Sequence, residues 1–407
     1  MGKRWCVVIV CVLISAPASV TEAQVRSWSL ADVLARVREQ SPAVLSARLA
    51  VEEVRARLAG ASLPRQGNPD IDVIAGHRRS VTGGFGDIQV AVSQPWEPAA
   101  RRIARIDEVR ASVAEATANV DDVTRLALRG AAGAFYRAVH ATARLALLDE
   151  AGVLANQVCE TADRRFRAGD VAVLDVNIAR TSRARLRASR EAAEAERRVA
   201  LGDLKQLLRT GDDVDVDGVL DMPGDVDRAR LSSLAAANRG EVRVLEAALQ
   251  ETDASVRLAA TFAKPTWGPR LQFSHEEGDN VLLGGLTLTL PTVAKGQELR
   301  ATASARAIRL RAELDVVRQR LQIEVTTTVD AYERRRAAVR VLADEAIASL
   351  DENDRLATRS YEVGQIGLPD LLLIRRETLD TRLQHVDALF EAVISRLDVD
   401  TAAGVLR

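Results

Sequence analysis

The sequence predicts a mainly α-helical protein with a small β part, organised as an internal two-fold repeat. Prolines are absent from residues 99–222 and 292–368. Because proline interrupts helix interiors, both intervals have room for long helices. Two short segments, 88–94 and 286–290, alternate apolar with polar or small residues, which is the pattern of a strand with two different faces. Only 3% of the 407 residues are aromatic, which suits helices packed closely side by side.

The proline-free intervals predict long, coiled-coil-like helices near 99–162 and 296–360. In the second interval Ala307, Leu310 and Leu314 begin a series of apolar residues at three- and four-residue steps, the spacing of one buried helix face. A helix of roughly 65 residues would be about 100 Å long. These dimensions indicate an extended molecule.

Each of these two segments is preceded by another in which the alternation is weaker and which is expected to be its partner strand. Residues 71–77 pair with 88–94 across Thr82–Gly84, and residues 270–275 pair with 286–290 across a Gly-Asp-Asn turn. This predicts two strands near 70–95 and two near 270–291. Each strand has about ten residues, enough to cross an outer membrane when tilted, with aliphatic side chains toward lipid and Gln, Ser or Thr toward a wet lumen.

The repeat is clearest where Phe166-x-x-Gly169, followed by Asp175, aligns with Tyr361-x-x-Gly364, followed by Asp370. The strand pairs recur at a similar offset. The sequence therefore predicts two copies of one plan (helix, two strands, long helix, turn, helix), at residues 24–210 and 230–407. Residues 211–229 connect them.

The N-terminal residues 1–23 have the three-part order of a secretory signal peptide, with basic, apolar and small residues in turn. The apolar run is too short for a membrane-spanning helix. Lipid attachment at Cys11 is a less favoured alternative, because the apolar run continues past it. No later segment reaches spanning length, so any entry into a membrane is expected through the strands.

The composition and the motifs of the chain argue against several classes of function. The chain carries 56 basic and 57 acidic residues and a net charge of −1, so no nucleic-acid partner is expected. Three cysteines and four scattered histidines predict neither a disulfide framework nor a metal site, and no cofactor is expected. The sequence also lacks a nucleophile elbow, a phosphate loop and a zinc-binding helix motif, so an enzyme is not predicted.

Four strands cannot close a membrane barrel alone, because an open edge leaves backbone groups unpaired in hydrocarbon. A barrel shared by three copies would contain twelve strands, an even number within the observed range. Long helices continuing from the strands would extend the ring as a helical tube. The predicted assembly is a conduit.

The chain resembles the TolC family of outer-membrane efflux proteins over nearly its whole mature length. The residues that carry the resemblance are Leu30–Val44 with its Ser-Pro step, Gln94-Pro95, Leu290-Pro291, Val214–Gly218 and Tyr361-x-x-Gly364 with Asp370-Leu371. The resemblance implies a homotrimer with a 12-stranded β-barrel in the outer membrane and a periplasmic α-barrel. It also implies a periplasmic adaptor protein and an inner-membrane transporter as partners. The heavy-metal exporter branch is compatible with the chain, as are drug and solvent exporters.

In that family the two helix turns form the periplasmic tips, so Phe166, Gly169, Tyr361 and Gly364 are the candidates for docking an adaptor. The glycines fit a reversal that requires positive φ. Asp370 matches the first of two carboxylates that line the family's entrance. Two interpretations of Asp370 are open at this point: a cation-attracting ring and a structural aspartate at a helix start.

Leu373 stands in this chain where the family has its second entrance carboxylate, so the chain departs there from the pattern of a paired acidic gate. Residues 213–218 resemble the start of a calcium loop, but Gly224 stands where the loop needs glutamate.

His77 and His275, with Trp96 and Trp267, are expected at the rim or belt of a membrane-facing sheet.

Two other classes of protein remain as alternatives. The first is a periplasmic coiled-coil structural or adaptor protein whose strands form a small soluble domain. The second is an exported hydrolase, which would need a catalytic cluster that the sequence does not show.

Overall fold

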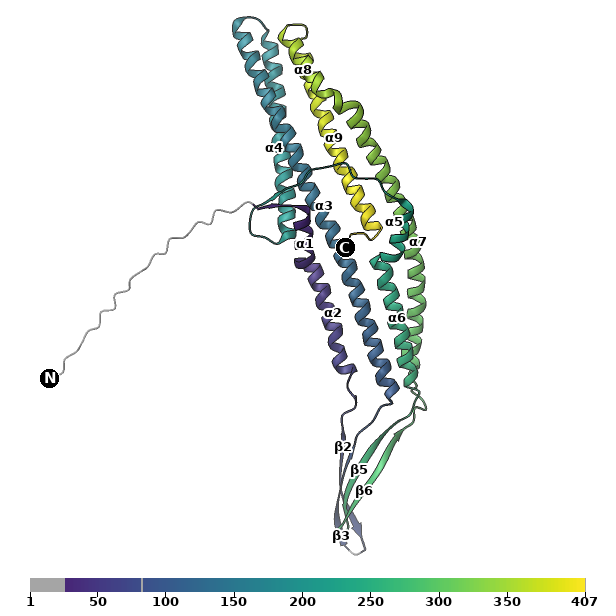
Figure 1. Cartoon of the computed structure of the whole chain (residues 1–407). Coiled ribbons are helices and arrows are strands. Elements are labelled where there is room, and N and C mark those ends of the chain that lie inside the picture. The colour runs from purple at the N-terminus through teal and green to yellow at the C-terminus, as the bar shows by residue number, and fades with distance from the viewer. Residues whose placement is uncertain (1–25, 82, 407) are drawn as a thin grey trace, which may run out of the picture.

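The computed structural model describes residues 26–81 and 83–406. The predicted signal peptide, residues 1–23, and Cys11 lie outside this part. The molecule is long and narrow, with a helical body that continues at one end into a β-sheet (Figure 1). Within the described residues no helix is both long and apolar enough to traverse a membrane.

The first half of the chain begins with two short helices. Ser29 caps the first: its Oγ accepts a hydrogen bond from the Asp32 N–H at 3.2 Å, and the Asp32 carboxylate accepts one from the Ser29 N–H at 3.4 Å. Pro42 opens the second helix, where its fixed φ fits the first turn. The elements that follow the N-terminal strand are α1 (Leu30–Gln40), α2 (Pro42–Ala61), β2 (Asp70–Ser80), β3 (Gly83–Ser93), α3 (Ala99–Ala168) and α4 (Val173–Leu208).

The second half has the same kinds of element in the same order. They are α5 (Arg228–Asn238), α6 (Gly240–Thr261), β5 (Thr266–Glu276), β6 (Asp279–Thr289), α7 (Gln297–Val341), the π-helical turn η1 (Leu342–Ile347), α8 (Ala348–Glu362) and α9 (Leu368–Ala402). The helix expected over 296–360 is thus interrupted by η1. Apolar periodicity does not reveal such a turn, because one extra residue leaves the pattern on both sides intact.

The four longer strands form one antiparallel sheet in the order β2-β3-β5-β6. The β5–β6 loop consists of Glu277 and Gly278, whose φ values of 52° and 95° match the twist of a two-residue hairpin. The sequence predicted a turn over Thr82–Gly84, but β3 already begins at Gly83. Within the described chain, β2 and β6 are the edges of the sheet.

A second, two-stranded sheet joins β1 (Arg26–Trp28) and β4 (Val214–Val216) in parallel. It lies midway along the helical body, where Trp28, Leu128 and Leu204 belong to the largest hydrophobic core. The sequence did not predict this pairing. The connection expected over 211–229 therefore begins as a strand that holds the N-terminal segment against the helices.

The helices lie side by side in two overlapping sets (Figure 1). Next to the sheet the order is α2, α3, α6, α7. Beyond the middle it is α4, α3, α9 and then the α7–η1–α8 helix. One long side of the molecule is consequently formed by α4, α1 and α2, and the other by α7, η1 and α8.

Two buried arginines anchor the C-terminal end of α9. Arg239 donates to the carbonyls of Thr401 and Ala402 at 3.0 and 3.1 Å, and pairs with Glu324 at 2.9 Å. Arg125 also donates to the Thr401 carbonyl. These arginines satisfy carbonyls that have no partner inside the helix.

Candidate functional site

The first candidate region is the turn between α3 and α4. Gly169 has a left-handed backbone with φ of 83°, which glycine adopts without the steric cost of a Cβ. The Gly169 N–H donates to the Phe166 carbonyl at 3.0 Å, and the Asp170 N–H donates to the Arg165 carbonyl at 2.9 Å. These bonds close the helix end.

The turn between α8 and α9 repeats this geometry 195 residues later. Gly364 has φ of 77°, and its N–H donates to the Tyr361 carbonyl at 3.2 Å. The Gln365 N–H donates to the Ser360 carbonyl at 2.8 Å. The positive φ predicted for both glycines is confirmed, whereas the docking role of the turns stays a prediction.

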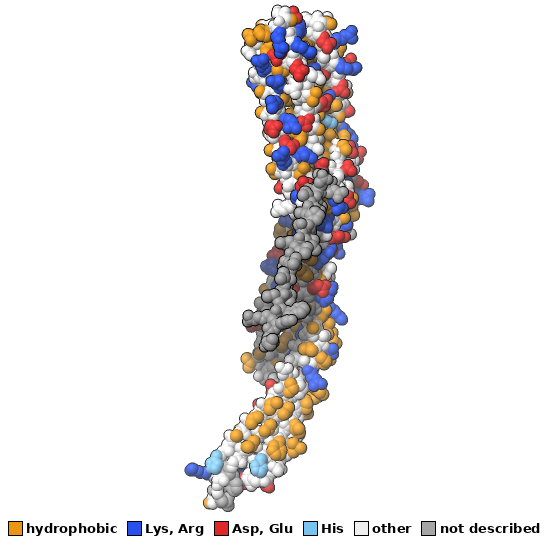
Figure 2. Space-filling model, turned by 90° about the vertical axis from the view of Figure 1, so that its left-hand side faces the viewer, with side chains coloured by type: hydrophobic (Ala, Val, Ile, Leu, Met, Phe, Trp, Pro, Cys, Tyr) orange, Lys and Arg blue, Asp and Glu red, His pale blue; other side chains and the backbone are white. Residues whose placement is uncertain are grey.

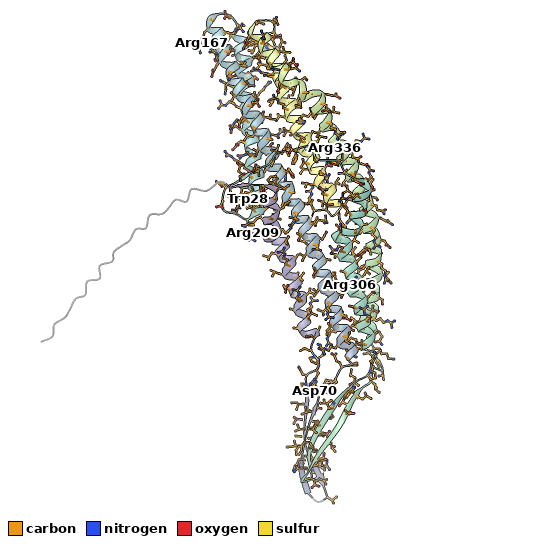
Figure 3. The ribbon with its side chains drawn as sticks, viewed as in Figure 1. Trp28, Asp70, Arg167, Arg209, Arg306 and Arg336 are labelled. Atoms are coloured by element: carbon orange, nitrogen blue, oxygen red, sulfur yellow. The ribbon has the colours of Figure 1, made fainter. Side chains whose placement is uncertain are left out.

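The side chains of the two turns differ in exposure. Phe166 is 43% exposed, but the Tyr361 ring is half-buried beneath Arg165, whose guanidinium carbon lies 5.4 Å from the ring centroid. The two helical hairpins, α3–α4 and α8–α9, are connected just behind the turns by a small core that contains the buried Cys159 and Leu371. Both turns therefore lie together at the end of the molecule farthest from the sheet, where Figure 3 labels Arg167.

Matching polar contacts hold each hairpin closed. In the first, Arg180 of α4 pairs with Asp163 of α3 at 3.0 Å. In the second, Arg375 of α9 donates to Thr358 of α8 at 3.1 Å. Each residue of the second pair stands 195 positions after its counterpart in the first, which is the same offset as between the two glycines.

Asp370 is exposed and lies in the first turn of α9. Its carboxylate accepts a hydrogen bond from the Gly367 N–H at 3.2 Å, and its charge is favourable at a helix N-terminus. Leu373, one turn further on, is 58% exposed. The geometry therefore gives Asp370 the structural role that the sequence allowed as an alternative, while a role at an entrance stays a prediction.

The second candidate region is the β-sheet, whose two faces differ in chemistry. One face is apolar, and many of its side chains are between 41% and 67% exposed: Ile71, Val73, Ile88, Val92, Leu271, Phe273 and Leu282. On the other face Arg270 reaches across β3 to Asp72 at 3.1 Å, beside Gln89 and Gln272. Exceptions on the polar face are Ile74, Val281 and Leu283.

Aromatic residues bound the apolar face at both ends. At the helical end, Trp96 and Trp267 contact edge to face, with centroids 4.8 Å apart. At the hairpin end lie His77 and His275, the latter hydrogen-bonded to Asn280 at 2.8 Å. Figure 2 shows histidines just beyond the apolar surface of the sheet. These four residues lie at the two ends of the apolar face, and their place in a membrane belt or rim stays a prediction.

Arg78 connects the two β-hairpins, β2–β3 and β5–β6, at the end of the sheet farthest from the helices. It pairs with Asp87 of β3 at 2.9 Å, with Glu276 of β5 at 3.2 Å and with Glu277 of the following loop at 3.0 Å. The Arg78 guanidinium donates hydrogen bonds to the carboxylates of Asp87 and Glu277. This cluster was not predicted, because Arg78 and the two glutamates are almost 200 residues apart in the chain.

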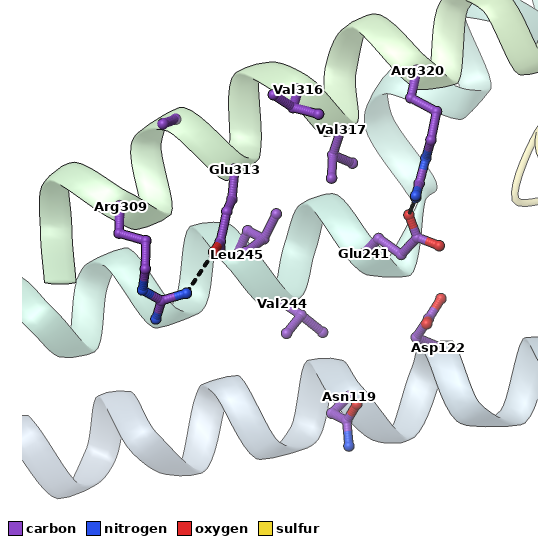
Figure 4. A pocket seen from close by; sticks show the side chains of 11 residues that line it. Asn119, Asp122, Glu241, Val244, Leu245, Arg309, Glu313, Val316, Val317 and Arg320 are labelled. Atoms are coloured by element: carbon purple, nitrogen blue, oxygen red, sulfur yellow. Dashed lines mark hydrogen bonds and ion pairs between the residues drawn. The ribbon is translucent and has the colours of Figure 1, made fainter.

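Two further features lie along the helical body. An open groove of about 690 Å³ runs along α6 between α3 and α7; Val244, Leu245 and Val317 form part of its wall, and Arg320 pairs with Glu241 at its rim (Figure 4). Nearer the turns, His140 and Arg144 of α3 both contact Asp387 of α9, at 2.7 and 2.5 Å. Neither the groove nor the His140–Arg144–Asp387 cluster corresponds to a known sequence motif.

The acidic segment 213–218 is occupied by ion pairs. Lys205 contacts Asp213 at 3.1 Å and Arg197 contacts Asp215 at 3.0 Å. Over residues 26–81 and 83–406, no three His, Cys, Asp or Glu side chains gather in an arrangement suited to a metal ion.

No protein-family model and no curated protein matches the sequence, but solved structures match the fold closely. A membrane protein from Pseudomonas aeruginosa aligns over 92% of both chains with a TM-score of 0.75 and 19% identity. CusC, whose structures concern transmembrane channel formation, aligns over 92% of both chains with a TM-score of 0.73 and 16% identity.

The Campylobacter jejuni CmeC outer membrane channel aligns over 92% of this chain and 85% of that chain, with a TM-score of 0.70 and 15% identity. The fold, a helical body with a β-sheet at one end, is therefore shared with these solved membrane proteins. It is the fold of the TolC-like outer-membrane channels, as the resemblance of the sequence predicted.

Proposed function

We propose that the chain is the subunit of a homotrimeric outer-membrane efflux channel. Its sheet would supply four of the twelve strands of a shared β-barrel, and its helices would form a tunnel through the periplasm. Conduction along such a tunnel is passive, so the subunit needs no catalytic group or cofactor. A periplasmic adaptor would open it, and an inner-membrane transporter would supply the energy and select the cargo.

The observation that carries this proposal is the two-faced sheet with two open edges. Its apolar face exposes large aliphatic side chains along all four strands, and a contiguous apolar surface of this kind marks a membrane or protein contact. The unpaired backbone groups of β2 and β6 would find partners only by closing the sheet with other strands. A small soluble domain, the alternative interpretation, would have to bury this face.

The length of the apolar face approaches the thickness of a bilayer. Trp267 and His275 bound it on β5 and are eight residues apart, which corresponds to about 26 Å along a strand and to about 20 Å of height at a strand tilt of about 40°. The apolar band of an outer-membrane barrel is about 25 Å tall and is flanked by aromatic residues. Trp96 and Trp267 stand at the end that would face the periplasm.

The helical edges also expose apolar residues that other copies would cover. Along α7, Ile308, Val316 and Ile323 are 67%, 64% and 68% exposed. Along α2, Leu45 and Leu49 are 45% and 61% exposed. These two helices form opposite edges of the molecule, so a head-to-tail ring would bring one edge against the other.

The turns and Asp370 would lie at the periplasmic end of the tunnel. Phe166, with Val363 of the second turn at 63% exposure, offers apolar surface to an adaptor, whereas Tyr361 is partly covered by Arg165. We keep Phe166, Gly169, Tyr361 and Gly364 as the docking region, and Asp370 as an entrance residue.

Membrane fractionation with a matched pair of variants tests the function. Phe273→Asp places a charge on the apolar face, where a charged side chain is unfavourable near the middle of a bilayer. Gln272→Asp places the same charge on the polar face. The wild type and Gln272→Asp should be recovered from outer membranes and form conducting channels in planar bilayers, and Phe273→Asp should not. Equal behaviour of the two variants, or a wild type found only in the soluble periplasm, would favour the structural or adaptor alternative.

A further inference from the structure

Arg187 and Glu345 stand out as exposed charged residues on opposite edges of the molecule. Arg187 lies on α4 and Glu345 lies in η1. Within the described residues neither makes a hydrogen bond or an ion pair. Other arginines of α4 have acidic partners: Arg180 pairs with Asp163 and Arg190 pairs with Asp149, whereas Arg183 and Arg185, like Arg187, have none within the described residues.

The internal repeat relates these two residues to a contact that the chain already makes. Arg382 of α9 pairs with Asp351 of the neighbouring α8 at 2.5 Å and also with Glu150 of α3 at 3.4 Å, across the junction between the two helical hairpins. Arg187 stands 195 positions before Arg382, and Glu345 stands 195 positions after Glu150. This is the offset that relates the glycines of the two turns.

The arrangement of the helices allows the contact to recur between chains. Inside the chain, α9 of the second hairpin lies against α3 of the first. In the repeat, α4 is the counterpart of α9, and η1 with α8 is the counterpart of the C-terminal part of α3. The helix α4 and the η1–α8 segment form the two outer edges of the half of the molecule that carries the turns. A head-to-tail ring places η1 of one copy beside α4 of the next.

We propose that Glu345 of one copy forms an ion pair with Arg187 of the next, repeating the Glu150–Arg382 contact at each junction between copies. The inference rests on the proposed function, because it requires a closed ring, and it specifies which surfaces form the junction. Neighbouring residues fit this contact. Leu379 and Leu383 of α9, which pack with α3, correspond to Ala184 and Ala188 of α4. Both alanines are exposed, and their small side chains leave room for a neighbouring helix.

Thiol crosslinking in membranes tests the contact directly. In a Cys159→Ala background, Arg187→Cys is combined with Glu345→Cys. The Cα atoms of an Arg–Glu pair are more than about 7 Å apart, too far for a disulfide, so a bismaleimide spacer is used. The matched control combines Glu345→Cys with Arg185→Cys, an exposed position about 200° away around the same helix.

The expected result is covalent dimers and trimers for the 187/345 variant and monomers for the 185/345 variant. Equal crosslinking of both variants, or no crosslinking of 187/345 in a protein that is still trimeric by native mass, would overturn the contact alone. A wild type that is not trimeric would instead overturn the proposed function, and the inference with it.

Charge reversal provides a second readout that does not depend on crosslinking. Arg187→Glu and Glu345→Arg each place like charges together at every junction, so each should lower the temperature at which the trimer dissociates. The combined variant restores opposite charges and should recover most of the shift. If the combined variant loses as much as the two single variants together, the two residues do not meet.

Discussion

The guanidinium of Arg165 lies over the ring of Tyr361, with its central carbon 5.4 Å from the ring centroid. The two residues belong to different hairpins, at the ends of α3 and α8. Their contact is therefore a direct connection between the two turns that the proposed function places at the channel entrance. In the second turn, Ser360 corresponds to Arg165, just as Tyr361 corresponds to Phe166. Ser360 has no cationic group, so it cannot form the same contact with the Phe166 ring.

Arg165→Ala should loosen the entrance. A partly exposed cation–π contact contributes about 0.5–1 kcal/mol, and three such contacts would be lost per trimer. We expect a larger fraction of open channels in planar bilayers. Arg167→Ala is the control, because Arg167 lies at the same helix end without a partner in the described residues. Equal effects of the two variants would mean that the ring contact does not restrain the entrance.

Gly169→Ala and Gly364→Ala should each reduce stability by about 1 kcal/mol, because a Cβ is unfavourable at positive φ. No neighbouring atom lies within 4 Å of a Cβ added at either position, so the cost is conformational. Gly152→Ala, inside α3, also meets open space and should be stabilising by up to about 1 kcal/mol. Urea unfolding measures all three, and a loss of stability in Gly152→Ala comparable to the other two would contradict this explanation.

Substitutions of Asp370 separate its charge from its hydrogen bond. Asp370→Asn retains an acceptor for the Gly367 N–H but removes the charge, whereas Asp370→Ala removes both. If Asp370 lines the entrance, Asp370→Asn should lower the cation preference of the channel in planar bilayers. If its role is only structural, selectivity should be unchanged in Asp370→Asn, and Asp370→Ala should lower stability by about 1 kcal/mol.

Asp387 should make stability depend on acid pH. Burial opposes its ionisation, but hydrogen bonds from Arg144 and His140 outweigh burial and hold its pKa below the usual value. Because the folded pKa is depressed, the stabilisation is present above the unfolded pKa of about 3.9 and is lost as pH falls through the folded value. Asp387→Asn should weaken the dependence of the unfolding midpoint on pH below about 4. An unchanged pH profile would show that this contact between α3 and α9 does not contribute.

The sequence predicted those features that leave a local pattern. Alternation located the four long strands, because each has one apolar and one polar face. The repeated glycine motif located the two turns, because positive φ restricts the residue type. Proline positions bounded the long helices.

Features that depend on distant partners were not predicted. The pairing of Arg26–Trp28 with Val214–Val216 joins segments almost 200 residues apart, and neither segment alternates long enough to indicate a strand. Arg165 and Asp387 are ordinary charged residues of helices until the fold brings Tyr361 and His140 against them. The π-helical turn η1 was missed for a different reason, because one inserted residue does not disturb the apolar pattern on either side of it.

In the proposed function, copies of this chain close their sheets together in an outer membrane. The native mass of the wild-type protein, extracted by detergent from outer membranes, is the decisive measurement. We expect the mass of three chains, each about 44.0 kDa before removal of any signal peptide. Recovery of a single chain from the soluble fraction, without detergent, would disprove the shared barrel.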